Sequence, residues 1–201
     1  MEKRIAPWQV LESRMSYEDR WLRVRSDTCR TAQGYIVEPY HVMEYLDWVN
    51  VLALTTDEQV ITVREYRHGV GQVLLGLPGG GVEMRDQSPL AAIQRELLEE
   101  TGYGGGQFFA VGQSFPNTGN QNNTLWSFLA VEVVKLQEQQ LDEAEHIEIV
   151  LQDFTDFNRD IWGGAIPLQS LHLATIGLAS HFIKQSKLPE LEALRRALQQ
   201  R

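Results

Sequence analysis

Cysteine and long apolar runs are both scarce in this sequence. Cys29 is the single cysteine among 201 residues, so the chain forms no internal disulfide and no cysteine-only metal site, as is typical of a reducing compartment. No uninterrupted apolar stretch approaches the ~18 residues of a membrane-spanning helix, and the charged start, Met1–Arg4, has no apolar run behind it. We therefore expect a soluble, cytoplasmic protein without a membrane partner.

Positive charge is also in short supply. The chain has 18 Lys and Arg against 27 Asp and Glu, which gives a net charge of -9. Such a charge opposes the phosphates of DNA or RNA, which proteins bind through clustered cations, so we expect no nucleic-acid partner. A small diphosphate is still compatible with an acidic protein, because a divalent cation can bridge carboxylates and phosphates.

The order of apolar runs and turn residues predicts two domains. Residues 1–46 contain short β-rich runs that indicate an antiparallel meander, with strands over 8–15, 21–26 and 35–44. Residues 47–201 are expected to form a mixed sheet covered by helices. The strands and C-terminal helices expected there cover 49–55, 60–66, 108–111, 125–134, 147–151, 168–182 and 188–198.

One further helix is expected in the second domain. Ser88 is a good N-cap, and Pro89 suits the first helical position. Gly102 is a typical residue at a helix end. A glycine-rich loop, Gly76–Gly81, lies just before this helix in the sequence.

Three glutamates on this helix form the informative pattern. Glu96, Glu99 and Glu100 stand at i, i+3 and i+4, so their carboxylates project from neighbouring positions. A solvated acidic face is one explanation of such a cluster. However, at about 100° per residue, Glu96 and Glu100 lie along the edge of the apolar stripe that contains Leu90 and Leu97. Carboxylates at a core boundary beside a glycine loop make an oxygen-only site suited to Mg²⁺ or Mn²⁺.

The helix and its preceding loop resemble a known family motif. The stretch Arg95–Gly102 is similar to the second half of the Nudix box, and Gly81 stands upstream at the expected spacing. The resemblance implies an α/β/α sandwich of the α/β class in which divalent cations polarise a diphosphate and lower the pKa of an attacking water. The groups implied to hold these cations are three side chains and one backbone carbonyl: those of Glu96, Glu99 and Glu100, and that of Gly80 or its neighbour Gly79.

One position departs from the box. Gln87 stands where the family has a glutamate, although its spacing from Gly81 and from Arg95 fits. The resemblance assigns Arg95 to the catalytic machinery beside Glu96, as a structural partner of the carboxylates. We expect the missing charge to weaken metal affinity without abolishing catalysis, with Glu83 or Asp86 compensating.

Further segments resemble the ADP-ribose pyrophosphatase branch of the Nudix hydrolases. They are Val63–Arg67, Leu77–Gly80 and Phe115–Gly119. This resemblance implies that Arg67, with Arg64 and Pro116, contacts the substrate, and that Trp21 in the meander stacks on the adenine, often in a domain-swapped homodimer. Two plainer alternatives stay open, since strand arginines often pair with surface acids and Trp21 could anchor the core.

A catalytic glutamate is expected in the acidic stretch before the last predicted strand. Related pyrophosphatases carry a mobile loop at this position, and Glu145 is the best match. Solvated surface is the ordinary alternative for such a loop. None of the five histidines shows metal-ligand spacing, and we expect His68 to be the one that lines the site.

The sequence therefore predicts Mg²⁺-dependent attack of water on a diphosphate phosphorus, with a nucleoside monophosphate as one product. ADP-ribose, which would give AMP and ribose 5-phosphate, is the leading substrate, and other nucleotide sugars, dinucleoside polyphosphates and dinucleotides are alternatives. A Nudix-fold protein that senses a nucleotide sugar without cutting it is a second interpretation, motivated by Gln87. A structural or interaction module, in which the glutamate cluster is coincidental, is a third.

Overall fold

The computed structural model describes residues 5–143 and 145–199. These divide into two compact units. The first contains the described residues up to Leu46 together with Phe115–Thr124, and the second contains Asp47–Ser114 and the described residues from Leu125 onward. The expected boundary at residue 46 would leave Phe115–Thr124 in the second domain, whereas the structure groups this segment with the first unit.

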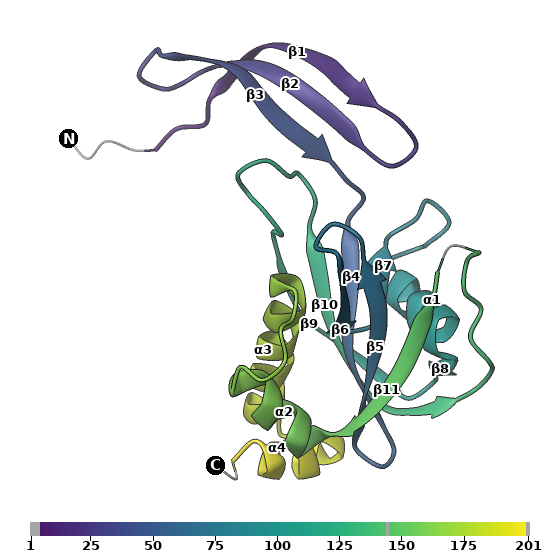
Figure 1. Ribbon diagram of the computed structural model, residues 1–201. Helices are drawn as coiled ribbons and strands as arrows, with labels where there is room; N and C mark the ends of the chain where they lie inside the picture. The colour runs from purple at the N-terminus through teal and green to yellow at the C-terminus, as the bar shows by residue number, and fades with distance from the viewer. Residues whose placement is uncertain (1–4, 144, 200–201) are drawn as a thin grey trace. The chain divides into compact units, whose positions relative to one another are not determined.

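The first unit is a three-stranded sheet (Figure 1). Its strands are β1 (Gln9–Glu18), β2 (Arg23–Arg30) and β3 (Ile36–Glu44), in the order β1-β2-β3 and with antiparallel pairing throughout. The predicted antiparallel meander is thus confirmed, with every strand beginning one or two residues later than the pattern indicated. Polar side chains link the strands: the Ser13 hydroxyl of β1 donates to Asp27 of β2 over 2.6 Å, and Arg25 of β2 forms an ion pair with Glu44 of β3.

The second unit is built on an eight-stranded mixed sheet. The path β11-β5-β4-β10-β8 forms its centre, while β6, β7 and β9 pair with β5, β4 and β10. Only β4 and β10 run parallel among the described strand pairs of this sheet. The strand bounds are Trp48–Thr55 (β4), Gln59–Arg67 (β5), Gln72–Gly76 (β6), Gly79–Gly81 (β7), Tyr103–Gly104 (β8), Gln107–Ser114 (β9), Leu125–Lys135 (β10) and Ile147–Asp153 (β11).

Helices cover both faces of this sheet. Figure 1 shows α1 (Pro89–Thr101) on one face and α3 (Ser170–Gln185) on the other. The face with α3 also carries α2 (Phe154–Trp162) and, after the 3-10 turn Pro189–Leu191, α4 (Glu192–Ala197). The predicted α/β sandwich with a mixed sheet is confirmed. The helix α2 was missed because its nine residues directly continue β11 without a turn signal.

Strand β4 shows why two helical layers are needed. Its inner residues are all buried, because alternate side chains enter two separate cores. Leu52 and Leu54 pack in the core beneath α2 and α3, whereas Val51 and Ala53 pack in the core beneath α1. Within the described residues, no helix has the length and apolar character needed to cross a membrane. The cytoplasmic location stays a prediction.

Candidate functional site

The ends of α1 fix which way its glutamates face. The Ser88 hydroxyl accepts a hydrogen bond from the Ala91 N–H over 3.2 Å, and Pro89 occupies the first turn. At the other end Gly102 adopts a left-handed conformation with φ 71°, where a Cβ would lie 2.1 Å from the Gln137 carbonyl oxygen. Both predicted helix ends are therefore confirmed, and glycine is required at the second.

The buried face of α1 differs from the predicted stripe at one end. Leu90 is 40% exposed, while Ala92, Ile93 and Leu97 are fully buried. The buried face continues through Glu100, which is only 9% exposed. A carboxylate therefore enters the edge of the core at the C-terminal end of the helix.

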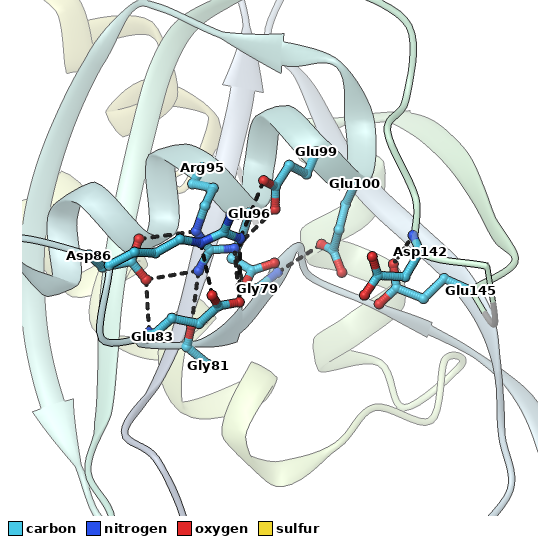
Figure 2. Close-up of polar contacts among 11 residues, drawn as sticks. Gly79, Gly81, Glu83, Asp86, Arg95, Glu96, Glu99, Glu100, Asp142 and Glu145 are labelled. Carbon is cyan, nitrogen blue, oxygen red and sulfur yellow. Dashed lines mark hydrogen bonds and ion pairs between the residues drawn. The ribbon is translucent and has the colours of Figure 1, made fainter. Parts of the chain in front are cut away.

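Glu100 is the most buried of the three helix glutamates. Its Oε2 accepts a hydrogen bond from the Gly79 N–H over 3.0 Å (Figure 2). Burial raises the pKa of Glu100 to about 8, against the effect of the Gly79 hydrogen bond, and the nearby charges of Glu96, Glu65 and Glu145 raise it further. The carboxyl group of Glu100 therefore ionises readily only when a positive charge lies beside it.

Glu96 lies against the glycine loop. A Cβ on Gly80 would come within 2.3 Å of the Glu96 carboxylate, so a larger residue there would displace that carboxylate. Burial raises the pKa of Glu96, although the neighbouring Arg95 charge and hydrogen bond act in the opposite direction. Its side chain keeps 15% exposure, and that of Glu99 keeps 33%, so both are more accessible than Glu100.

Arg95 of α1 contacts carboxylates of both the helix and the preceding loop. Its Nε and Nη2 donate to the two carboxylate oxygens of Asp86 over 3.0 and 2.9 Å, and Nη2 also donates to the Gly81 carbonyl over 3.1 Å. Its Nη1 lies 3.0 Å from both Glu96 and Glu99 (Figure 2). The hydrogen bond to Asp86 is the largest of the effects that raise the pKa of Arg95. Arg95 stays charged and holds the loop and helix together.

Asp86, and not Gln87, supplies the carboxylate that pairs with Arg95. The Asp86 side chain is 5% exposed and also accepts the Glu83 N–H over 2.8 Å. Gln87 is exposed and makes no side-chain hydrogen bond within the described residues. The charge missing at Gln87 is therefore present one residue earlier in the chain, which explains how the Arg95 network forms without the box glutamate.

Two more carboxylates approach this cluster, Glu65 from β5 and Glu145 from the segment before β11. Glu65 lies on β5 opposite Ile147 of β11, so Glu145, two residues earlier, comes close to the same end of the sheet. Figure 2 shows Glu145 on the side of Glu100 that lies away from Arg95, and Glu145 contributes to the raised pKa of Glu65, Glu96 and Glu100. Glu145 is exposed, and its carboxylate accepts the Asp142 N–H over 3.2 Å.

Glu65 was not predicted as a site residue. Burial is the main cause of its raised pKa, and the ion pair with Arg67 acts against it. The signal was available in the sequence, because Glu65 and Arg67 are two residues apart on a strand and therefore share a face. Arg64 faces the other way, where it forms an exposed ion pair with Glu148 over 3.0 Å. Arg67 thus lies beside the cluster, while a substrate role for Arg64 stays a prediction without support from this geometry.

Arg67 also lines a pocket of about 310 Å³ next to the glycine loop. The histidine in this pocket is His172 of α3, whereas His68 packs edge-on against Tyr66. His172 is 2% exposed, and burial, followed by the charge of Arg67, lowers its pKa to about 4. A neutral imidazole therefore borders the site.

Trp21 and Pro116 belong to the first unit. Trp21 is 74% exposed, with the Arg20 guanidinium 4.1 Å from its ring centroid. This exposure is unlike that of a core anchor. Pro116 is half-buried in Phe115–Thr124, where the Met43 N–H donates to the Asn120 carbonyl. The substrate roles of both residues stay predictions.

The donor set fits a hard divalent cation. Among the described residues, no three acidic, histidine or cysteine side chains already converge as a metal cage, because Arg95 draws Glu96 and Glu99 toward itself. The groups that could hold Mg²⁺ or Mn²⁺ are nevertheless all oxygens. They are the carboxylates of Glu96, Glu99 and Glu100, together with the carbonyl of Gly80, the residue that lies against Glu96. The mutual repulsion among the carboxylates is what a cation would relieve.

Comparison with known proteins agrees with this geometry. Residues 46–168 match the family model described as NUDIX domain, and residues 8–43 match the one described as nucleoside diphosphate sugar hydrolase N-terminal domain. The chain is 31% identical to ADP-ribose pyrophosphatase of Bacillus subtilis (strain 168) over 103 residues, which are 51% of this chain and 55% of that protein. It is 28% identical to putative nudix hydrolase 2 of Caenorhabditis elegans over 111 residues, 50% of this chain and 49% of that protein.

The chain thus spans about half the length of the curated relatives it matches. A solved structure described as an ADP compounds hydrolase has the same fold, with a TM-score of 0.76 and 19% identity over 92% of this chain and all of that one. The match of the NUDIX model over more than half of the residues, together with the helix, glycine loop and carboxylates described above, shows that this chain belongs to the Nudix family.

Proposed function

We propose that the chain is a pyrophosphohydrolase that uses Mg²⁺, or Mn²⁺ in its place, to cleave the diphosphate linkage of a nucleoside diphosphate derivative. ADP-ribose or another nucleotide sugar is the expected substrate, and a nucleoside monophosphate and a sugar phosphate are the expected products. The observation that carries this proposal is the contact of Glu96 and Glu100 with one glycine loop, with the charges of Glu65 and Glu145 close to Glu100 and the pKa of Glu65, Glu96 and Glu100 raised.

The choice of substrate is supported by the relatives. The model matched by the first unit is named for nucleoside diphosphate sugar hydrolases, and the Bacillus subtilis relative is named for ADP-ribose. In ADP-ribose the diphosphate is flanked by two riboses, so a single loop that binds diphosphate serves either half. Arg67 supplies the positive side chain that would contact the diphosphate beside the loop.

The proposed reaction assigns cation binding and proton transfer to different residues. A divalent cation held by Glu96, Glu99, Glu100 and the Gly80 carbonyl would neutralise the diphosphate charge and acidify the attacking water. Glu145 accepts the proton of that water as its oxygen bonds to phosphorus and the bridging P–O bond breaks. Glu145 suits this step because it is exposed and close to the buried carboxylates without being one of the proposed ligands.

A second candidate is a Nudix-fold protein that binds a nucleotide sugar without cutting it. Gln87 motivated this alternative, because it lacks the charge of the box glutamate. The ion pair between Asp86 and Arg95 now supplies that charge from the adjacent position. We therefore favour the enzyme.

A panel assay tests the proposal. The purified protein is incubated with ADP-ribose, other nucleotide sugars, dinucleoside polyphosphates and dinucleotides, each with Mg²⁺ and with Mn²⁺, and the products are separated by chromatography. We expect AMP and ribose 5-phosphate in equal amounts from ADP-ribose. Tight binding of a nucleotide sugar without product would favour the sensor instead.

We also propose that the chain forms a homodimer through its first unit. Strand β1 is an edge of its sheet and is exposed along its whole length, and it carries the large apolar side chains of Val10, Leu11, Met15 and Tyr17. An exposed apolar edge strand is a ready site for pairing. Light scattering at assay concentration should give twice the chain mass of 22.9 kDa, and a monomer would refute this proposal.

A further inference from the structure

Gln139 lies in the segment between β10 and β11 and binds two elements of the candidate site at once. Its Nε2 donates to the Glu100 carbonyl oxygen over 2.6 Å and to the Ile147 carbonyl oxygen over 3.1 Å. The first carbonyl is in the last turn of α1, and the second belongs to the first residue of β11. Two carbonyl acceptors fix which end of the amide faces them, because only its nitrogen carries two donors. The Gln139 side chain therefore joins α1 to β11.

The two carbonyls belong to the parts of the chain that carry acidic side chains of the site. Glu100 is itself the most buried of the helix glutamates. Ile147 is two residues after Glu145, and it is the cross-strand partner of Glu65 in the register between β11 and β5. The charges of Glu65 and Glu145 both raise the pKa of Glu100, so the three carboxylates lie near one another. The Gln139 amide thus contacts the backbone at the point where these three side chains meet.

The end of α1 does not depend on Gln139 alone. The last carbonyl groups of a helix have no partner within it, and in α1 the two carbonyls on either side of residue 100 are bound by other groups. The Gln140 N–H donates to the Glu99 carbonyl over 2.8 Å, and the Lys135 Nζ donates to the Thr101 carbonyl over 3.1 Å. We therefore expect the end of α1 to stay in place when the side chain at position 139 is changed.

The stretch that carries Glu145 is held to α1 by fewer contacts. In its described residues, 141–143 and 145–146, the hydrogen bonds are local. The Glu145 N–H donates to the Asp142 carbonyl over 3.0 Å, and the Asp142 N–H donates to the Glu145 carboxylate over 3.2 Å (Figure 2). Pairing with β5 holds Ile147 beside Glu65 but makes no connection to the helix. The separation between Glu145 and Glu100 therefore depends on the Gln139 side chain.

We propose that Gln139 is a positioning residue, which holds Glu145 at the distance from Glu100 at which it can take a proton from the attacking water. This inference rests on the proposed function, in which Glu145 is the base. Gln139 acts through the backbone of Ile147 and is assigned no contact with substrate or cation. Its loss should therefore slow the reaction while the affinities for substrate and cation stay the same. A displacement of about 1 Å is sufficient, since misplacement of this size can cost ~10²-fold in rate.

A double-mutant cycle tests this role. The unmodified chain, Gln139→Met, Glu145→Gln and the double variant are each assayed for hydrolysis of ADP-ribose at saturating Mg²⁺. Methionine has the length of glutamine but donates no hydrogen bond. We expect Gln139→Met to lower kcat by roughly 10- to 100-fold with little change in KM. In the Glu145→Gln background the same substitution should lower kcat by less than about twofold, the scatter with which independent effects add, because no base is left to position.

Gln140→Met is the matched control. Gln140 is the adjacent glutamine, it is exposed, and its hydrogen bond to α1 comes from the backbone N–H. The same chemical change at this position should leave kcat and KM within about twofold of the unmodified values. Gln139→Asn is a second variant for the case that Gln139→Met does not fold. It keeps the amide on a shorter side chain that cannot reach both carbonyls, and its kcat should lie between those of the unmodified chain and Gln139→Met.

Two measurements that do not require turnover distinguish positioning from general damage. Calorimetric titration with Mg²⁺ should give Gln139→Met an affinity within about twofold of the unmodified value, because the end of α1 keeps its other partners. Urea unfolding should show that each variant is folded under the assay conditions. An equal fall in kcat with and without Glu145, or a loss of Mg²⁺ affinity large enough to account for the lower rate, would overturn the inference.

The same set of proteins separates this inference from the proposed function. No hydrolysis of any nucleotide sugar by the unmodified chain would refute the proposed function and the positioning role with it. Hydrolysis that Glu145→Gln slows, but that Gln139→Met and Gln139→Asn leave unchanged, would refute only the role of Gln139.

Discussion

Replacing Asp86 by Asn tests whether Asp86 supplies the negative charge that the box glutamate would provide at Gln87. The substitution keeps the shape and one acceptor oxygen but removes the charge that Arg95 contacts through two hydrogen bonds of 3.0 and 2.9 Å. The side chains of this pair are 5% and 15% exposed. Removing one partner of a buried pair costs about 3–5 kcal/mol. Arg95 keeps Glu96 and Glu99, so we expect about 2 kcal/mol, within that order of magnitude.

Thermal and urea unfolding measure this loss. For a chain of this size, 1 kcal/mol lowers Tm by about 2–4 °C, so Asp86→Asn should lower it by about 4–8 °C by the same scaling. The hydrogen bond from Arg95 is the first cause of the lowered pKa of Asp86. The advantage of the unmodified protein should therefore hold above about pH 4 and decline as the pH falls through the lowered pKa.

Gln87→Ala is the matched control, because Gln87 is adjacent but exposed. It should change Tm by about 1 °C or less, as is usual for surface positions. Asp86→Asn should also weaken activation by Mg²⁺ by roughly 10-fold or more, since Arg95 then no longer holds in place the carboxylates that we propose bind the cation. Equal destabilisation by the two variants, or an unchanged Tm in Asp86→Asn, would refute the assignment of Asp86 to the role of the missing glutamate.

Three other substitutions probe the site and its surroundings. Glu100→Gln should abolish nearly all turnover and raise the unfolding free energy of the cation-free protein at pH 7, because a carboxyl group whose pKa rises to about 8 must take up a proton on folding and the amide need not; wild-type turnover would remove Glu100 from the site. Glu145→Gln should lower kcat by ~10²–10⁴ with KM little changed, and Glu143→Gln should do much less; a reversed order in the kinetic assay would move the catalytic role to Glu143. The stability advantage of the unmodified protein over His172→Phe in urea should fall as the pH falls from 6.5 toward 4, because the unfolded chain gains a proton at His172 that the folded chain does not bind. A pKa change from 6.5 to about 4 corresponds to about 3 kcal/mol; the same pH dependence in the two proteins would contradict it.

The fold was largely predictable because its signals are local. The Ser88 cap, the proline after it and Gly102 define α1 within a few residues, and alternating or continuous apolar runs identify the longer strands. The short strands β6, β7 and β8 were not predicted, and for β7 the reason is that its three glycines have little strand propensity. Gly79–Gly81 is a strand only because β4 provides a partner for pairing, and this information is not local.

The site was predictable where its residues share one helix. The i, i+3 and i+4 spacing identified Glu96, Glu99 and Glu100, but the approach of Glu65 depends on the register between β5 and β11. The position of His172 depends on the packing of α3 against β6, some hundred residues earlier in the chain. Neither the register nor the packing can be derived from spacing. The pairing of Asp86 with Arg95 was one of two options in the sequence, and only the loop geometry decides between Asp86 and Glu83.

Dependence of turnover on a divalent cation tests the central claim most directly. Hydrolysis of ADP-ribose is measured after the protein has been freed of metal with a chelator and again as Mg²⁺ is returned stepwise, with AMP and ribose 5-phosphate quantified by chromatography. We predict no turnover without the cation and saturable recovery with equal amounts of both products. Undiminished hydrolysis by the metal-free protein, or no hydrolysis of any nucleotide sugar by folded protein with Mg²⁺ or Mn²⁺, would contradict the role assigned to the carboxylates.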